Sequence, residues 1–209
     1  ATVLRELSKY SVDALLLEAN PDFAAGVTKG NGGCVHSGYD ATKGSLKAKL
    51  NVRGVELWPE FAKDLDIPYV RLPSLTLAFT DEERETLEVL LENGNHNGVP
   101  GLEIIGRDEI LAIEPTVNPD VKYALKAPTS GITEPYIIVY ACIENAIKNG
   151  AEAKANQKVV KIEKLDDGYK VITQTDEFET KIIVNAAGVY GDVIANMVSP
   201  GKYKIKERH

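Results

Sequence analysis

The chain has 209 residues, of which 44% are hydrophobic and 26% are charged, and its formal net charge is −7 at pH 7. This length and apolar fraction suffice for a packed core in one large domain or two small ones. The acidic balance and the lack of a long basic tract argue against a nucleic-acid partner. No apolar run approaches the roughly 20 residues of a membrane span and no secretory signal is visible, so we expect a soluble, cytoplasmic, globular protein.

Cysteines and histidines are too few and too scattered to indicate a metal site or a disulfide framework. The two cysteines, Cys34 and Cys142, lie far apart in the sequence. The three histidines, His36, His96 and His209, lack the spacing of metal ligands. We therefore expect no bound metal and a reducing compartment.

The first elements in chain order are a predicted helix over residues 1–10 and a short apolar run over residues 13–18, which is typical of a buried strand. The run ends in an acid, Glu18. In a Rossmann unit, a carboxylate at the end of the second strand accepts hydrogen bonds from a ribose, whereas an isolated acid is more often a solvated strand end. The glycine-rich loop that should precede the helix is absent and the chain begins with Ala1, so the sequence predicts a fragment.

Residues 20–39 form a long loop rich in glycine and small polar residues. Loops of this length inside compact domains usually carry function. Four candidate residues follow one another closely in it: Asn31, Gly32, Gly33 and His36. Residues 44–66 then repeat apolar side chains at helical spacing, which predicts one long helix with a potential break near Gly54 and Pro59.

Residues 69–127 resemble an insertion with its own strands and helices. Residues 69–72 and 75–79 predict two short strands separated by a Pro73-Ser74 turn. We expect this insertion to contribute to a substrate-facing lobe.

Two helices are predicted inside this insertion. The first is charged, begins at Asp81 and ends near Leu91, where Asn93-Gly94 indicates a stop. The second is short and runs from Gly106 to the break at Glu114-Pro115.

The last third of the chain alternates a helix with short strands. Residues 134–149 predict a helix that Gly150 terminates. An antiparallel meander follows, with strands predicted at residues 159–165, 169–175 and 177–180. Such a meander is more typical of FAD-binding domains than of a simple Rossmann repeat. A nicotinamide-dependent dehydrogenase is therefore the less favoured alternative.

Residues 182–184 form a second run typical of a buried strand, and it leads through Ala186, Ala187 and Gly188 into a helix. Such small side chains let a ligand approach the backbone closely, and a helix N-terminus offers N–H groups to an anion. A dinucleotide pyrophosphate fits this description. A tight packing corner without a ligand is the alternative.

Three segments carry a resemblance to a known family. They are KGNGGCVHSGY at residues 29–39, GSLKAKLNVRG at residues 44–54 and NAAG at residues 185–188. In these segments the chain resembles FAD-dependent oxidoreductases of the D-amino-acid oxidase superfamily, in particular the glycerol-3-phosphate dehydrogenase and L-2-hydroxyglutarate oxidase branch. The resemblance covers nearly the whole chain.

The resemblance implies roles for single residues. Glu18 would bind the adenosine ribose, Asn31, Gly32 and Gly33 would lie beside the pyrophosphate and ribityl chain, Val159 would contact adenine through its backbone, and Ala187 and Gly188 would close over the dinucleotide. His36 would lie near the flavin ring, where it tunes electrostatics or transfers a proton, unless it is a loop histidine bonded to the backbone.

The fold that the resemblance implies is of the α/β class with α+β elements: a three-layer, Rossmann-like FAD-binding domain with part of a mixed substrate domain inserted. The FAD-binding domain would comprise residues 1–68 and 128–199. The partial substrate domain would comprise residues 69–127, and residues 200–209 would begin its remainder.

The expected activity is hydride transfer from a small anionic hydroxy compound to FAD, with glycerol 3-phosphate as the first choice. The alternatives are an L-2-hydroxy acid or amino acid oxidase of the same superfamily, and a truncated flavoprotein domain without catalytic activity. The electron acceptor is not indicated, and peripheral association of the parent protein with a membrane stays open. Lys47, Lys49 and Arg53 are candidate partners for the anion, although solvated surface charges are the more common use of such residues.

Overall fold

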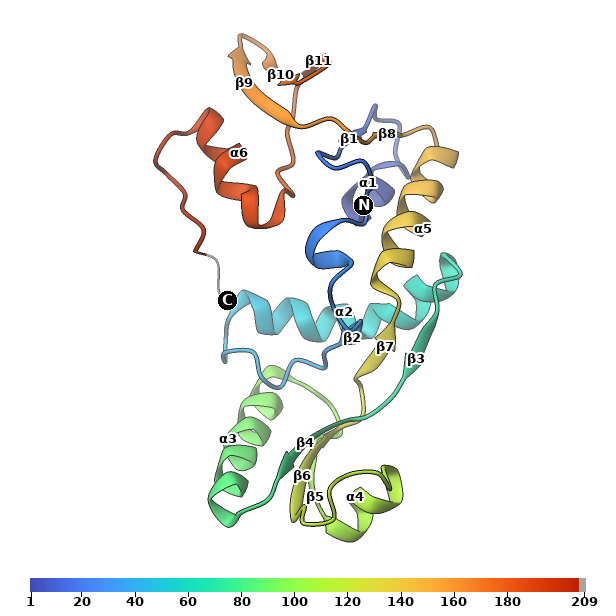
Figure 1. The fold of residues 1–209 in the computed structure, drawn as a ribbon, viewed down its shortest axis with the longest axis vertical. Helices are drawn as coiled ribbons and strands as arrows, with labels where there is room; N and C mark the ends of the chain where they lie inside the picture. Colours follow the sequence, from blue (N-terminus) through green and yellow to red (C-terminus); the bar gives the residue numbers. More distant parts are fainter. Residues whose placement is uncertain (207–209) are drawn as a thin grey trace. The chain divides into compact units, whose positions relative to one another are not determined.

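The computed structural model describes residues 1–206, which form two compact units. Unit 1 consists of residues 1–25 together with the residues from 142 onward, and unit 2 consists of residues 26–141. Both units combine helices with strands (Figure 1), so the predicted mixed α/β class is confirmed.

Unit 1 contains a short parallel pair of strands and a separate antiparallel sheet. Its elements are α1 (Thr2–Leu7), β1 (Leu15–Leu17), β8 (Glu152–Lys154), β9 (Val159–Leu165), β10 (Gly168–Thr173), β11 (Glu177–Thr180), η2 (Gly188–Tyr190) and α6 (Gly191–Val198). The helix α5 (Pro135–Lys148) enters this unit from unit 2. Strand β1 pairs in parallel with β8, and Leu4 of α1 packs with Ala146 of α5 and with Ala151. The predicted order of helix followed by strand is confirmed.

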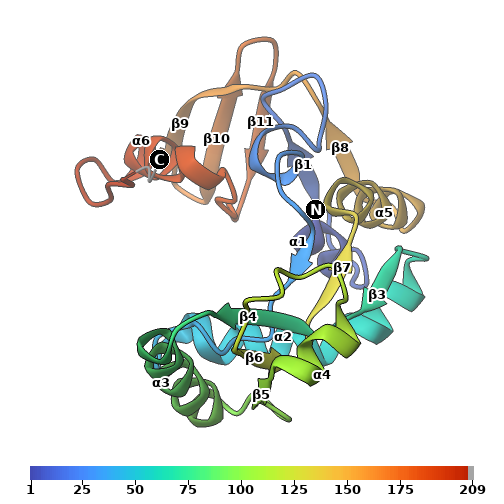
Figure 2. The ribbon, with the colours of Figure 1, turned by 60° about the horizontal axis from the view of Figure 1, so that its bottom comes forward.

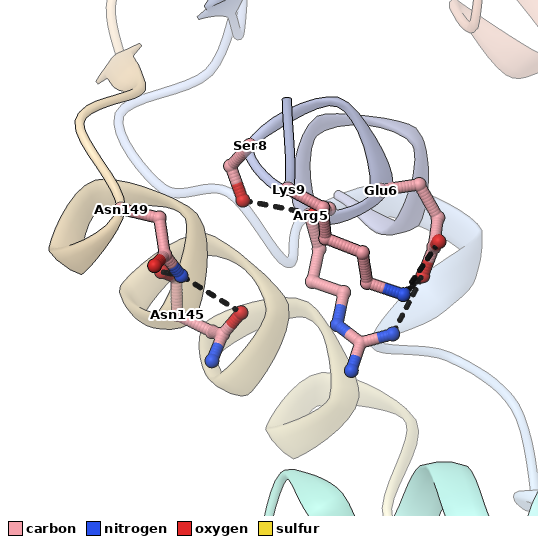
Figure 3. Close-up of polar contacts among 6 residues, drawn as sticks. All are labelled: Arg5, Glu6, Ser8, Lys9, Asn145 and Asn149. Atoms are coloured by element: carbon pink, nitrogen blue, oxygen red, sulfur yellow. Dashed lines mark hydrogen bonds and ion pairs between the residues drawn. The ribbon is translucent and has the colours of Figure 1, made fainter. Parts of the chain in front are cut away.

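Polar contacts complete the ends of α1 and α5 (Figure 3). The Glu6 carboxylate accepts from Lys9 Nζ at 2.7 Å, and this hydrogen bond is the main reason that the pKa of Glu6 lies below its usual value. Ser8 Oγ donates to the carbonyl oxygen of Arg5 at 2.8 Å. Asn149 Nδ2 donates to the carbonyl oxygen of Asn145 at 2.8 Å, which satisfies a C-terminal carbonyl of α5.

The predicted antiparallel meander is confirmed. Strands β9, β10 and β11 form one sheet in the order β11-β10-β9 (Figure 2). Gly168 begins β10 directly after the turn that joins it to β9, and its φ of +120° is a conformation that a side chain disfavours. Ile162 and Val171 face each other across the two strands and are buried.

The prediction of a buried strand at residues 182–184 is wrong. The segment forms no strand, and Ile182 and Val184 are 77% and 57% exposed. The apolar run lacks a partner strand among residues 1–206, and an unpaired extended segment cannot bury its side chains in a sheet. For the same reason β1, which pairs on one side only, is shorter than predicted and leaves Leu15 exposed.

Unit 2 contains two antiparallel three-stranded sheets, with the strand orders β2-β7-β3 and β4-β6-β5. Its elements are η1 (Gly26–Thr28), β2 (Cys34–Val35), α2 (Leu46–Asp64), β3 (Tyr69–Arg71), β4 (Ser74–Ala78), α3 (Asp81–Asn97), β5 (Glu103–Gly106), α4 (Arg107–Ile113), β6 (Tyr123–Ala127) and β7 (Gly131–Thr133). The helices α3 and α4 both accompany the β4-β6-β5 sheet (Figures 1 and 2). The predicted insertion therefore has its own core, in which Ile110 and Val121 pack in one cluster and Leu87 and Leu125 in another.

Two helices of unit 2 are longer or more regular than predicted. Helix α2 continues through both Gly54 and Pro59, because Val55 and Ala62 on either side of the proline are buried and offset its cost. Helix α3 continues through Gly94 and ends at Gly98, which has φ +83°. Gly94 therefore does not end the helix but lets it pack closely against Leu102 and Tyr39.

Candidate cofactor site and active site

The loop that carries His36 lines a cavity of about 320 Å³ in unit 2. Its volume falls within the roughly 300–1,000 Å³ that is typical of small-molecule sites. Three segments contribute its walls. They are the loop residues Asn31, Gly33, Cys34, Val35 and His36, the α2 residues Leu50, Asn51, Gly54, Val55 and Trp58, and Thr133, Pro135 and Ile138 around the start of α5.

Gly33 fixes the position of this loop against β7. It has φ +68°, and a Cβ atom built on it would overlap the carbonyl oxygen of Thr133. The Thr133 N–H donates to the carbonyl oxygen of Gly33 at 2.9 Å, directly before β2 pairs with β7. Only glycine permits both the left-handed backbone and this close approach.

Asn31 holds the start of the same loop. Its Oδ1 accepts from the Gly33 N–H at 2.9 Å, and its Nδ2 donates to the carbonyl oxygens of Val27 and Thr28. The amide therefore shapes the backbone that a ligand would meet. Among the described residues, no atom lies within 4 Å of the place where a Cβ on the neighbouring Gly32 would lie, so the backbone there is open to a ligand.

His36 is exposed and lines the cavity. Within residues 1–206 its imidazole makes no hydrogen bond, so the interpretation as a loop histidine bonded to the backbone finds no support there. A histidine that is free to exchange protons with a ligand suits general acid–base chemistry.

One aromatic side chain of the cavity wall, Trp58, was missed at the level of sequence. Trp58 stacks on Tyr69 with ring centroids 5.7 Å apart and meets Phe61 edge to face at 5.5 Å. In the sequence, Trp58 and Phe61 are only two apolar positions of a helical pattern. Asn51, also in the cavity wall, has a buried Oδ1 with no hydrogen-bond partner in the described part of the chain.

Glu18 lies where the sequence predicts it, directly after the carboxyl end of the parallel strand β1. Its Oε1 accepts from the backbone N–H and from Nδ2 of Asn20, at 2.8 and 2.7 Å. Oε2 accepts no hydrogen bond from residues 1–206, so the carboxylate is held in place with one oxygen left for a second donor such as a ribose hydroxyl.

The other candidates of unit 1 lie on exposed or half-buried backbone. Val159 begins β9, and Gly188, with φ +56°, has open space around its Cα. Ala187 precedes it and is half-buried. At the start of α6, however, the Asp192 carboxylate already accepts from the Val193 N–H, which leaves this helix end less suited to an anion than the sequence indicates.

The candidates divide between the two units. Glu18, Val159, Ala187 and Gly188 belong to unit 1, and Asn31, Gly32, Gly33 and His36 belong to unit 2. Convergence of the two sets on one dinucleotide stays a prediction.

The three basic candidates on α2 are solvated. Lys47 and Arg53 are more than 60% exposed and pair with Asp40 and Glu56, at 4.0 and 2.8 Å, and Lys49 is exposed. The surface-charge alternative is therefore the better description of this helix face.

A cation that the sequence analysis did not single out lines a second cavity of about 220 Å³ in unit 2. Arg71, at the end of β3, makes no ion pair within residues 1–206 and shares this cavity with Ser37 and Thr129. Both hydroxyls belong to residues that are only 1% and 6% exposed, and neither has a partner in the same range. Arg71 therefore brings a guanidinium without an ion-pair partner in residues 1–206 to a cavity that Glu56 also lines, and a guanidinium is a strong donor for an anion.

No group of three metal-type side chains gathers anywhere in residues 1–206. None of the helices in that range has both the length and the apolar character needed to cross a bilayer.

A family model described as FAD dependent oxidoreductase matches residues 1–208. The chain belongs to this family. The predicted family and its cofactor, FAD, are thereby confirmed.

Individual relatives of this FAD-dependent oxidoreductase are similar over nearly all of the chain. The glycerol 3-phosphate dehydrogenase of Caloramator mitchellensis is 43% identical over 207 residues, which cover 99% of this chain and 43% of the relative. The glycerol 3-phosphate oxidase of Mycoplasma genitalium is 33% identical over 206 residues, which cover 95% of this chain and 54% of the relative. The FAD-bound, dithionite-reduced L-α-glycerophosphate oxidase of Mycoplasma pneumoniae superimposes with a TM-score of 0.87 at 30% identity. The match covers 94% of this chain and 53% of that structure. The chain thus spans about half the length of the relatives it matches.

The residues of unit 2 fit part of an FAD molecule. The cavity combines the ring of Trp58 and several aliphatic side chains with the polar side chains of Asn31 and His36. A flavin carries a flat apolar ring system with polar edges, which matches this mixture of walls.

Replacing Gly33 by alanine should destabilise the chain and weaken FAD binding. We expect a loss of about 1–2 kcal/mol from the left-handed backbone and roughly 1–3 kcal/mol more from the overlap with Thr133. Urea unfolding of Gly33→Ala and FAD titration followed by absorbance would measure the two effects.

Gly44→Ala is the matched control, because Gly44 has φ +72° but no atom within 4 Å of a Cβ. This variant should show only the backbone cost. Equal unfolding free energies for the two variants would contradict the importance of the Gly33 contact.

Proposed function

We propose that the protein carrying this chain oxidises glycerol 3-phosphate and passes the electrons, through FAD, to an external acceptor. The observation that carries the proposal is the cavity beside Gly33 and His36, in a chain 43% identical to a glycerol 3-phosphate dehydrogenase. FAD, when bound, accepts a hydride from the carbon that bears the substrate hydroxyl.

The residues of the chain supply binding, orientation and proton transfer. Gly32 and Gly33 let the dinucleotide approach the loop backbone, and Glu18 accepts a hydrogen bond from its ribose. Trp58 lines one side of the cavity and excludes water there. His36 takes the proton of the substrate hydroxyl on a ring nitrogen as the hydride leaves.

The direct test uses the flavin colour of the FAD-loaded protein under anaerobic conditions. Glycerol 3-phosphate should bleach the yellow absorbance within the mixing time of a manual assay. Matched additions of L-2-hydroxyglutarate and of a small L-amino acid should leave it unchanged.

Bleaching by L-2-hydroxyglutarate but not by glycerol 3-phosphate would replace the proposed substrate with the L-2-hydroxy acid alternative. A protein that never acquires flavin absorbance would favour the non-catalytic alternative instead.

Arg71 is the cation that we expect to bind the phosphate group of the substrate. Its guanidinium is unpaired in the described range and lines a cavity of about 220 Å³. Hydrogen bonds to charged groups contribute about 1.5–3 kcal/mol, which corresponds to roughly a tenfold to hundredfold change in binding. Arg71→Met should therefore raise KM for glycerol 3-phosphate by at least about tenfold, with a much smaller effect on kcat.

Lys47→Met is the control, because Lys47 is a solvated cation that pairs with Asp40 and lines neither cavity. Steady-state kinetics should give an unchanged KM for it. Equal KM values for Arg71→Met and the wild type would remove Arg71 from the substrate site.

A further inference from the structure

The loop after His36 is tied to α3 by two side-chain amides. Asn93 Nδ2 donates to the carbonyl oxygens of Tyr39 and Ala41, at 2.6 and 2.8 Å. Asn97 Nδ2 donates to the carbonyl oxygens of Gly38 and Ala41, at 3.1 and 2.8 Å. The two asparagines lie one helical turn apart, so both face the same side of α3. We call this arrangement the amide clamp.

The orientation of the clamp follows from its chemistry. Each NH₂ group faces two carbonyl oxygens, which can only accept hydrogen bonds. Asn97 Oδ1 is buried without a partner within residues 1–206. If the amide were flipped, this oxygen would face the carbonyl oxygens of Gly38 and Ala41, and three hydrogen-bond acceptors would meet without a donor. An aspartate at either position would create that repulsion permanently.

The helix that supplies the clamp is itself firmly anchored in unit 2. Thr80 and Glu83 form a capping box at the start of α3. Further along, Gly94 lies against the Cα and Cβ of Tyr39 so closely that a Cβ on the glycine would overlap Tyr39. The Tyr39 ring packs with Leu87 and Leu125, and its hydroxyl shares a 2.7 Å hydrogen bond with Thr76.

Little freedom remains between the clamp and His36. Only Ser37, which is 1% exposed, separates His36 from the first clamped residue, Gly38. Gly38 has φ +103°, and a Cβ there would collide with the side chains of Asn51 and Val52 of α2. Since the His36 imidazole has no hydrogen-bond partner in residues 1–206, its place in the cavity depends on the backbone that carries it.

We propose that Asn93 and Asn97 are positioning residues, which hold the Gly38–Ala41 loop so that His36 faces the cavity in one fixed orientation. This inference rests on the proposed function, in which His36 exchanges a proton with the substrate. It connects α3, an element of the insertion, to the chemistry of the cavity. Neither asparagine touches substrate or cofactor in this proposal.

The test compares Asn93→Asp, Asn97→Asp and the double variant with Asn95→Asp. Asn95 is exposed on the same last turns of α3 and makes no side-chain contact with the loop within residues 1–206, so its variant controls for the added charge. Amide hydrogen exchange of peptides covering residues 34–45 reports the loop without any need for FAD. The Hε1 resonance of His36 reports whether its imidazole keeps one environment.

We expect amide exchange of the loop to accelerate at least tenfold in the double variant and the His36 resonance to shift or broaden. Peptides of β6 and β7, which belong to the same unit as the clamp, should exchange as in the wild type, which shows that this unit is folded in the variant. In the FAD-loaded protein, kcat for glycerol 3-phosphate should fall at least tenfold while KM changes less than threefold. Asn97→Ser, which retains one donor, should restore part of kcat relative to Asn97→Asp.

Unchanged loop exchange and an unchanged His36 resonance in the double variant would overturn the proposal, whether or not the protein oxidises glycerol 3-phosphate. Faster loop exchange with a wild-type kcat would also overturn it, because the loop would then be free to move without consequence for His36. Failure of the proposed function alone would appear differently: the exchange and resonance effects would be present in a protein that no substrate bleaches.

Discussion

At Gly33 the backbone passes so close to the Thr133 carbonyl oxygen that no side chain can stand between them. This contact joins β2 to β7 and sets where the following residues lie. Cys34 and His36 are then exposed at the cavity, whereas Val35, which also lines it, and Ser37 are buried. One left-handed glycine thus determines which side chains of the loop can meet a ligand.

The rest of unit 2 supports this loop from its other end. Tyr39 packs into the core of the insertion, and the amides of Asn93 and Asn97 hold the backbone around it. The loop is therefore fixed twice, by β7 before His36 and by α3 after it. A general acid or base must be held within a fraction of an ångström of its partner, and two anchors around a short segment provide such precision.

Much of this arrangement was predictable from the sequence, because its signals are local. Helical periodicity located α2, α4 and α5, and the glycine-rich segment with His36 located the candidate site. The error at residues 182–184 has a non-local cause: an apolar run becomes a strand only when a partner is present, and the sequence pattern contains no information on pairing. The early stop predicted for α3 failed because Gly94 serves packing against Tyr39, which is distant in sequence.

The same distinction explains which site residues were found and which were missed. Asn31, Gly33 and His36 lie in one short motif, whereas Arg71, Asn93 and Trp58 acquire their roles from neighbours far along the chain. No spacing rule connects an asparagine on an outer helix to a loop more than 50 residues earlier. Such residues become visible only once the fold brings them together.

The central claim is that the cavity beside Gly33 receives FAD, and Cys34 offers a direct measurement because its thiol is exposed and lines that cavity. Cys142 is buried, and burial raises the pKa of its thiol, so a thiol reagent should label Cys34 alone in the native chain. Saturating FAD should slow the labelling of Cys34 at least tenfold, whereas NAD should not. Labelling of Cys34 at an unchanged rate in the presence of saturating FAD would contradict the claim.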